Sequence, residues 1–396
     1  FENVIGVDMG GTSTDVSLTY GGEMTSTRDW HIEYGHPICF PSIDIKTVGA
    51  GGGSIAWIDE GGSLRNGPQS AGASPGPACY GYDGREPTNT DANLVLGRLS
   101  GDLVGGELTL DISRAKEVIE SKIAGPLSMD LASAAKAIIS VANANMADAI
   151  RLVSIMKGYD PRDFALVAFG GAGALHGAAL AKDLSIPTVI VPPHPGVTSA
   201  LGCLLVDIQH DLLTTYVTDA RKAEAQTVEA KFAELEQEAR TRLKAEGVNS
   251  RDTILKRTLD MRYAGQWRSL AVSVSSPFTS VKEAISGFES EHQREYGYTR
   301  DGAGVEIFRL NLTAVGVTPK AELPQKPVNK YKSKPKTTRD VVFDEKVNTA
   351  IFWRDDLSPG AELSGPAIIH QLDSTTVIPP YTSATIDSYS NIIITV

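Results

Sequence analysis

The first twenty residues alternate apolar and polar side chains on both sides of a short glycine turn. An apolar run ends at Asp8, Gly10 and Gly11 follow, and the alternation resumes after Asp15. Period-two spacing around a glycine pair predicts a strand, a tight turn and a second strand. Backbone N–H groups in such a turn form a concavity for an anion, and glycine lets a phosphate approach closely. A plain hairpin with two surface carboxylates is the alternative that this pattern leaves open.

Helical periodicity and apolar runs alternate farther along the chain. Apolar residues recur at spacings of three and four from 130 to 156, which predicts a helix with Asp130 as its N-cap. Residues 164–169 and 188–191 are apolar runs that predict buried strands. Between them, the Gly-Gly-Ala-Gly segment at 170–173 opens another helical stretch and forms a corner that can receive an anion or a nucleotide. Alternating strands and helices indicate an α/β layer architecture.

The second half of the chain has two helical stretches around strands, then a segment rich in Pro and Lys, then a β-rich end. The helices are expected at 223–246 and 281–296. Thr, Val, Ile and turn residues predominate after residue 340, which predicts β structure. These patterns divide the chain into four predicted parts: a first domain at 1–208, an α+β domain at 209–318, a linker at 319–340 and a small all-β domain at 341–396.

Two glycine-rich stretches interrupt the first predicted domain. Residues 49–53 contain four glycines in five positions, which suits a backbone that passes close to a ligand or to another chain segment. A flexible loop is the alternative there. Residues 61–90 are rich in Gly, Pro, Ser and Ala and lack helical periodicity. Because long loops are uncommon inside compact domains, we expect this one to be functional or disordered.

Composition and charge exclude several classes of protein. Hydrophobic residues make up 41% of the 396 residues and charged residues 21%, which is ordinary for a globular protein. The net charge of −11 argues against a nucleic-acid partner, because phosphate contacts need clustered Lys and Arg. No apolar run approaches the roughly 18–20 residues that cross a bilayer, and no segment resembles a signal peptide. We therefore expect no membrane segment. Cysteines occur only at 39, 79 and 203, without the spacing of disulfide or zinc frameworks, and this favours a cytoplasmic protein.

Several single residues are candidates for chemistry outside the glycine motifs. Cys79 could be a nucleophile, but no histidine lies near it in the sequence, and a small buried core residue is the favoured interpretation. Imidazole and carboxylate side chains suit divalent metals, although none of the candidates has the close spacing of a zinc motif. The strongest of them is His176, which follows the glycine corner by one helical turn. The candidate metal ligands are His36, Asp44, Asp91, His176 and His194.

Four stretches together resemble the hydantoinase A/5-oxoprolinase family, which also includes nucleotide-binding subunits of acetone and acetophenone carboxylases. The first hairpin is similar to the phosphate-binding hairpins of the actin, Hsp70 and sugar-kinase superfamily. The other stretches are Thr-Val-Gly-Ala-Gly-Gly-Gly-Ser-Ile at 47–55, the Gly- and Pro-rich loop at 67–81 and Phe-Gly-Gly-Ala-Gly-Ala-Leu-His at 169–176. The resemblance implies an actin-like, ribonuclease H-like first domain.

The same resemblance implies ATP and Mg²⁺ as cofactors. Main-chain N–H groups of the hairpin would bind phosphate oxygens, Asp8 and Asp15 would hold a hydrated metal, and the glycine corner would bind the purine or ribose side. The expected catalytic residues are Asp8, Asp15 and His176, with Asp8 and Asp15 also expected to bind the metal. The expected nucleotide-binding residues are Gly10, Gly11, Thr12, Ser13, Gly51, Gly52, Gly170, Gly171 and Gly173.

The activity implied by the resemblance is ATP-dependent hydrolysis of a cyclic amide, such as a hydantoin, 5-oxoproline or a lactam, through phosphorylation of the carbonyl oxygen. One alternative is a nucleotide-binding subunit of an ATP-dependent ketone carboxylase, and another is a non-catalytic actin-like nucleotide switch or scaffold. Family members carry an additional N-terminal domain with its own hairpin, whereas this chain has one hairpin. We therefore expect an oligomer in which that missing domain and a hydantoinase B-like subunit complete the enzyme.

Overall fold

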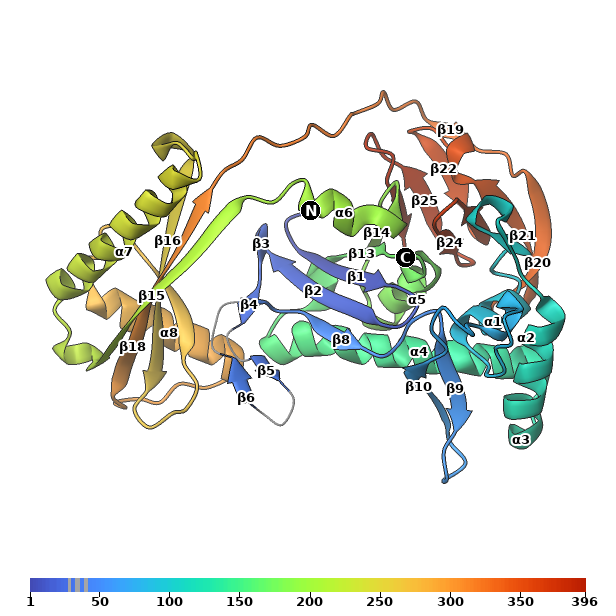
Figure 1. Cartoon of the computed structure of the whole chain (residues 1–396), viewed down its shortest axis with the longest axis horizontal. Helices are drawn as coiled ribbons and strands as arrows, with labels where there is room; N and C mark the ends of the chain where they lie inside the picture. The colour runs from blue at the N-terminus through green and yellow to red at the C-terminus, as the bar shows by residue number, and fades with distance from the viewer. Residues whose placement is uncertain (28–29, 33–35, 39–41) are drawn as a thin grey trace. The chain divides into compact units, whose positions relative to one another are not determined.

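The computed structural model describes residues 1–27, 30–32, 36–38 and 42–396, so Cys39 lies outside the described part (Figure 1). The described residues form two compact units. The first unit combines 1–200 with 323–396, and the second comprises 201–322. The residues on both sides of the second unit along the sequence thus build one body.

The first unit is built on a sheet that begins with the predicted hairpin. Strands β1 (Val4–Met9) and β2 (Thr14–Tyr20) pair antiparallel, and β3 (Glu23–Met24) continues from β2. On the other side, β13 (Ala165–Phe169) and β14 (Thr188–Val191) lie parallel to β1. The order β3-β2-β1-β13-β14, with β2 antiparallel, is the predicted ribonuclease H-like core.

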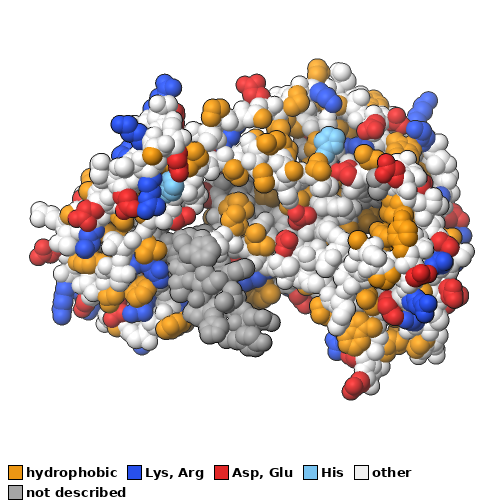
Figure 2. Space-filling model, in the orientation of Figure 1, with side chains coloured by type: hydrophobic (Ala, Val, Ile, Leu, Met, Phe, Trp, Pro, Cys, Tyr) orange, Lys and Arg blue, Asp and Glu red, His pale blue; other side chains and the backbone are white. Residues whose placement is uncertain are grey.

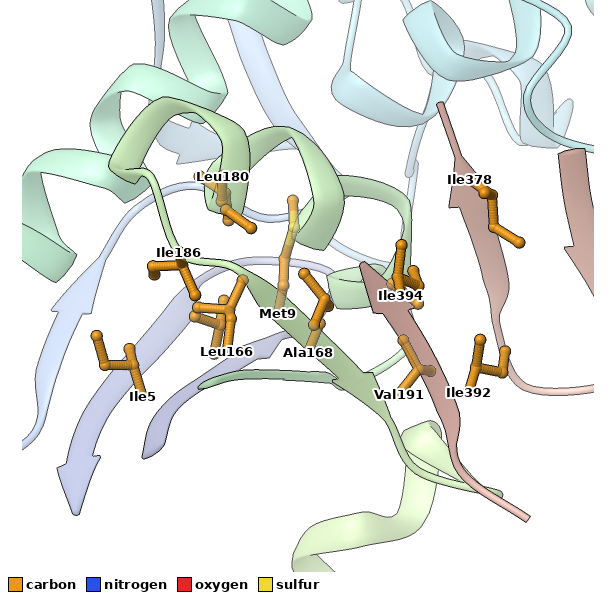
Figure 3. Packing of buried hydrophobic residues seen from close by; sticks show 14 of the residues in the cluster. Ile5, Met9, Leu166, Ala168, Leu180, Ile186, Val191, Ile378, Ile392 and Ile394 are labelled. Atoms are coloured by element: carbon orange, nitrogen blue, oxygen red, sulfur yellow. The ribbon is translucent and has the colours of Figure 1, made fainter. Parts of the chain in front are cut away.

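Side chains on β1 alternate between two environments, as period-two geometry requires. Ile5, Val7 and Met9 are buried, whereas Asp8 points to the opposite, partly exposed face. The buried face packs against α4 (Leu131–Val153) and α5 (Gly173–Leu184), and Figure 3 shows the side chains from β1, β13 and α5 in contact there. The alternation therefore places Asp8 away from the helical layer.

Helix α4 begins as the sequence predicts, since the Asp130 side chain accepts a hydrogen bond of 3.0 Å from the Ser133 N–H. It ends at Val153, before a short 3₁₀ turn that the left-handed Gly158 closes at φ 79°. Together, Leu131–Lys157 are long and apolar enough to cross a membrane by length and composition, a feature that core helices share. Half of the apolar 18-residue window within that stretch is buried in the structure, and α4 packs against β2 and β8 (Lys46–Val48) (Figure 1).

The C-terminal residues are rich in β structure, as predicted, but they do not form a body of their own. Strand β26 (Ile392–Thr395) pairs antiparallel with β14, and β25 (Ser383–Ile386) and β22 (Ala361–Ser364) continue the sheet. In Figure 3, Ile392 and Ile394 lie beside Val191 in the common core. Because β14 would otherwise expose an unpaired edge, the end of the chain completes the first unit.

A smaller four-stranded sheet follows the predicted linker. Its order is β20-β21-β23-β24, and its first strand begins at Thr337, inside the range expected for the linker, and ends just beyond that range. A two-residue strand, β19 (Tyr331–Lys332), also falls in that range and pairs with β22. The four strands are β20 (Thr337–Val342), β21 (Lys346–Trp353), β23 (Ala367–His370) and β24 (Thr375–Ile378).

The long segment between β3 and α4 carries many short elements. Its strands are β4 (Ser26–Thr27), β5 (Trp30–Ile32), β6 (His36–Ile38), β7 (Ser42–Ile43), β8, β9 (Ser54–Ile58), β10 (Leu64–Ser70), β11 (Asp102–Leu103) and β12 (Leu108–Thr109). Its helices are α1 (Asn89–Val95), α2 (Ile112–Ile119) and α3 (Gly125–Leu127). The stretch at 61–90, expected to be a loop, thus contains β10.

The second unit has the predicted α+β character. Its antiparallel sheet has the order β15-β18-β16-β17, and helices α7 and α8 share one apolar core with it around Phe232, Tyr263 and Phe288. The two long strands β15 and β18 were not predicted; β15 has a single buried position, whereas β18 is buried along more than half of its length. The elements are β15 (Ile208–Asp219), α7 (Ala225–Ala245), β16 (Thr253–Tyr263), β17 (Leu270–Val274), α8 (Val281–Tyr296) and β18 (Val305–Gly316).

Candidate nucleotide site

The two carboxylates of the hairpin lie opposite each other. Asp8 and Asp15 are direct partners in the antiparallel register, so their side chains share one face of the sheet. Asp8 Oδ2 accepts a hydrogen bond of 3.0 Å from Ser199, and Asp15 Oδ1 accepts one of 2.5 Å from Thr47. Both remain half-buried. The structure thus brings together the two residues predicted to bind a metal, although the described residues contain no cluster of three or more His, Cys, Asp or Glu.

The hairpin turn presents unused backbone donors. The Gly10 N–H closes the turn by donating to the Ser13 carbonyl at 3.0 Å. Within the described chain, the N–H groups of Gly11, Thr12 and Ser13 have no acceptor. A Cβ built on Gly11 would meet no atom within 4 Å, so there is open space at this turn. Three consecutive free donors beside open space form the cradle that an anion requires.

The glycine run at 49–53 supports this turn from behind. Gly52 N–H donates to the Gly10 carbonyl at 3.0 Å, and Gly53 N–H donates to the Gly11 carbonyl at 2.6 Å. A Cβ on Gly51 would lie 2.5 Å from the backbone nitrogen of Thr12, so only glycine allows this approach. The close backbone approach expected from the sequence is present, and its partner is the hairpin turn.

The second glycine motif lies next to the hairpin because β13 pairs with β1. Asp8 is the register partner of Phe169, and Gly170 follows at once in a left-handed conformation with φ 78°. A Cβ on Gly170 would lie 2.5 Å from Asp8 Oδ1. Gly173 then begins α5. Parallel strand pairing therefore brings two motifs that are far apart in the sequence to one corner of the sheet.

A cavity of about 280 Å³ opens at this corner. The hairpin contributes Gly10 and Gly11, the glycine run contributes Gly52 and Gly53, and the second motif contributes Gly171. Asp8, Asp15 and Thr12 lie outside the lining. The rest of the lining comprises Gly72, Pro77, Tyr80, Thr90, Leu99, Ser100, Asp102, Leu103, Gly105, Ala172, Leu175, Trp353 and residues 370–375.

Residues 370–375 and Trp353 are the part of this site that sequence reasoning missed. They form the turn between β23 and β24 and the end of β21. The available signal was the polar sequence Gln-Leu-Asp-Ser between two apolar runs. Local pattern alone gives no reason to place that turn beside the first hairpin, because the contact depends on how the C-terminal strands join the sheet.

Asp91 orders the glycine- and proline-rich loop. It forms a capping box with Thr88 at the start of α1, and its carboxylate also accepts a hydrogen bond of 2.8 Å from the Cys79 N–H. Cys79 is fully buried, and burial raises the pKa of its thiol far above the usual range. A thiol that stays protonated and is sealed from solvent has the properties of a packing residue.

His176 lies in the core between α5 and α4. Its Nδ1 is 2.6 Å from Asn143 Oδ1, so the neutral ring carries its proton on Nδ1, and Nε2 has no partner among the described residues. Burial lowers the pKa of His176 to about 3, which keeps the ring neutral at physiological pH. His176 is 1% exposed and is not part of the cavity lining, in contrast to the neighbouring Leu175.

The other candidate metal ligands are dispersed. Asp44 is buried and forms an ion pair with Lys157, and His194 is exposed at the start of a 3₁₀ turn. Asp91 has the capping role described above. For His36 the structure describes only the backbone, as part of β6.

Comparison with known proteins gives consistent matches along the whole chain. The sequence profile described as Hydantoinase/oxoprolinase matches residues 1–212, and the Hydantoinase/oxoprolinase C-terminal domain profile matches 216–394. The alpha subunit of caprolactamase from Pseudomonas jessenii is 36% identical over 96% of this chain and 56% of its own length. The crystal structure of that ATP-dependent caprolactamase superposes on 100% of this chain, and on 59% of its own, with a TM-score of 0.93 and 34% identity.

Two further relatives have names that denote other activities. 5-oxoprolinase 1 from Arabidopsis thaliana is 33% identical over 98% of this chain and 32% of its own length. The acetophenone carboxylase gamma subunit of Aromatoleum aromaticum is 32% identical over 98% of this chain and 56% of its own length. This chain therefore spans less than two thirds of each of these relatives.

Proposed function

This chain belongs to the hydantoinase/oxoprolinase family, and we propose that it binds ATP for the hydrolysis of a cyclic amide. The observation that carries the proposal is the set of N–H groups without an acceptor at Gly11, Thr12 and Ser13, in a turn where Gly11 adjoins open space and lines the cavity. The names of the caprolactamase and oxoprolinase relatives support a cyclic amide as the second substrate.

The residues present fit a nucleoside triphosphate and its metal. Backbone donors suit phosphate oxygens, and Asp8 and Asp15 offer the oxygen ligands that Mg²⁺ prefers while it keeps part of its water shell. Bound Mg²⁺ would supply neutralisation of phosphate charge. The chain's own contribution is to position the phosphates, which is the larger part of catalysis in phosphoryl transfer.

ATP gives a cyclic amide a route around its resonance stabilisation. Transfer of the γ-phosphoryl group to the carbonyl oxygen converts that oxygen into a leaving group, and water can then attack the ring carbon. We assign the attack of water and the ring opening to the complete enzyme, which would include an additional domain and a hydantoinase B-like partner subunit. The match to a caprolactamase alpha subunit supports a complex of several subunits.

A ketone carboxylase is the second candidate, because the acetophenone carboxylase gamma subunit matches over nearly the same length. Phosphorylation of an enolate or of bicarbonate would use the same phosphate cradle. A nucleotide switch would bind ATP in this cradle without substrate-stimulated turnover.

Phosphate release by the complete enzyme, in the presence of its partner subunit, tests the three functions. We expect release to increase with a hydantoin, 5-oxoproline or caprolactam and to yield the ring-opened acid. Stimulation only by a ketone with bicarbonate would support the carboxylase, and ATP binding without stimulation by either class would support the switch. Either result would overturn the proposed amidase.

A further inference from the structure

We propose that the turn between β23 and β24, residues 370–375, recognises the nucleoside of the bound nucleotide, with Gln371 and Ser374 as specificity-determining residues. This turn forms one wall of the cavity, and the phosphate cradle borders the same cavity through Gly10 and Gly11. A ligand anchored by its phosphates at the cradle can therefore extend to the turn. The inference depends on the proposed function only for the identity of the ligand as a nucleoside triphosphate.

Hydrogen bonds hold the turn in a fixed position. Asp373 Oδ2 accepts a hydrogen bond of 2.8 Å from the Gly196 N–H, and Asp373 Oδ1 accepts one of 2.6 Å from Gln371 Nε2. Gln371 Nε2 also donates to the Pro193 carbonyl at 3.1 Å. Both amide protons of Gln371 are thus engaged, which fixes the orientation of its side chain and leaves Oε1 as the free end.

Two polar atoms of this wall have no partner within the described chain. They are Gln371 Oε1 and Ser374 Oγ. The Ser374 residue is only 7% exposed, and both residues line the cavity. An unsatisfied buried polar atom is costly and uncommon, so two of them on one cavity wall indicate a ligand that completes their hydrogen bonds.

His370 adds a donor to the same wall through Thr375. Arg339 Nη2 is 2.9 Å from His370 Nε2, and because arginine can only donate, this nitrogen is the acceptor. Burial lowers the pKa of His370 to about 4, so its remaining proton is on Nδ1, 3.2 Å from Thr375 Oγ1. Thr375 Oγ1 accepts a hydrogen bond from the His370 Nδ1–H group, so the hydroxyl hydrogen of Thr375 remains free to donate to a ligand.

The wall therefore offers a fixed acceptor, a donor and an adaptable hydroxyl. Adenine presents an amino group beside a ring nitrogen acceptor, which complements this set. Apolar side chains of the same lining suit the faces of a flat base. Gly171 and Ala172, from the motif expected on the purine or ribose side, also line the cavity, which favours a nucleoside over the small cyclic amide as its occupant. The apolar residues are Leu99, Leu103, Leu175, Trp353 and Leu372.

Calorimetric titration of the complete enzyme with ATP and with inorganic tripolyphosphate tests the assignment. We expect Ser374→Ala and Gln371→Met to weaken ATP binding about tenfold each, the scale of one lost hydrogen bond to a buried group. Tripolyphosphate, which has no nucleoside, should bind as it does to the wild type. Thr376→Val is the matched control, because the Thr376 hydroxyl is also buried and unpartnered but does not line the cavity.

Base selectivity gives a second readout. Inosine triphosphate has a carbonyl oxygen in place of the adenine amino group, so wild-type enzyme should prefer ATP, and Gln371→Met should narrow that preference. Equal loss of ATP and tripolyphosphate, or unchanged ATP affinity, would overturn the inference. A higher KM for the cyclic amide with unchanged ATP affinity would reassign the turn to that substrate. The ATP and tripolyphosphate affinities can be measured without turnover of a cyclic amide. Absence of that turnover would therefore contradict the proposed function without affecting the test of the nucleoside site.

Discussion

At the scale of single residues, the carboxylate of Asp8 is the feature that one substitution tests most directly. Asp8→Asn keeps the shape but removes a charge that the proposed metal would need. We expect ATP turnover of the complete enzyme to fall by about 10² to 10³, equivalent to about 3–4 kcal/mol of transition-state stabilisation. The melting temperature should stay close to that of the wild type.

Ser199→Ala is the matched control for Asp8→Asn. It removes the hydroxyl that donates to Asp8 but leaves the negative charge in place. Its turnover should remain within a few-fold of the wild type. Near-normal turnover by Asp8→Asn would separate the hairpin carboxylate from the chemistry.

The buried histidines predict a dependence of stability on pH. Burial lowers the folded pKa of His176 to about 3, whereas the ordinary pKa of a histidine side chain is 6.5. Below pH 6.5 the unfolded chain therefore gains a proton that the folded chain does not, so this contribution to stability is lost as pH falls towards 3. His370 adds a loss of the same sign down to about pH 4.

We expect the free energy of unfolding to fall between about pH 7.5 and about pH 5, and His176→Gln to remove about 2 kcal/mol of that fall, because each pH unit corresponds to about 1.4 kcal/mol per group. Urea unfolding at the two pH values measures the difference. An unchanged pH dependence in His176→Gln would mean that His176 is protonated in the folded protein.

At the scale of elements, the packing of the glycine run behind the hairpin turn predicts a pair of contrasting substitutions. Gly51→Ala would place a Cβ 2.5 Å from the Thr12 backbone nitrogen, and we expect it to lower the free energy of unfolding by about 1–3 kcal/mol. Gly11→Ala meets no atom within 4 Å, so its stability should be unchanged while its Cβ occupies the space proposed for phosphate. Thermal unfolding and ATP titration separate the two effects. Equal stabilities would contradict the close packing.

Sequence patterns predicted the elements that are locally encoded. The Asp8–Asp15 hairpin, the Asp130 cap and the buried strand at 188–191 follow from periodicity and capping, which depend on neighbouring residues. The glycine run at 49–53 was predicted to pass close to a ligand or to another chain segment, but the spacing of its glycines could not identify the hairpin turn as that segment. Figure 2 is consistent with the argument from net charge against a nucleic-acid partner, since Lys and Arg on the visible face are interspersed with Asp and Glu rather than clustered.

Long-range pairing accounts for most of what the sequence could not predict. The wall formed by 370–375 depends on β23 and β24 reaching the first hairpin, although residues 21–366 separate them along the chain, and no local pattern encodes such a contact. His176 shows the converse case. Its position one turn after a glycine motif suggested the site, but the helical rotation directs it into the core while Leu175 lines the cavity.

At the scale of the whole molecule, the chain has one hairpin of the kind proposed to bind phosphate, whereas actin-like sites use two. We expect the 396-residue chain alone to bind ATP more weakly than about 0.1 mM, a free energy of about −5.5 kcal/mol, because the phosphates would remain exposed to water. No stimulation of hydrolysis by a cyclic amide is expected from it. Calorimetry with and without the additional domain supplied as a separate chain measures the effect. Micromolar affinity with full turnover in the isolated chain would show that one hairpin is sufficient.

The pairing of β26 with β14 has a consequence for the order in which the protein can fold during synthesis. Ile392 pairs with Val191, so the edge of β14, in the sheet that carries the hairpin and the glycine corner, stays unpaired until residues 392–395 have been synthesised. Residues 201–322 form a unit with its own core and can fold earlier, while the first unit waits with an open edge. A nascent chain stopped before β26 would expose the backbone of β14 to pairing with other chains. The synthesis of β26 thus determines when the sheet beside the candidate nucleotide site is complete, and a chain that stalls before β26 is a candidate for aggregation.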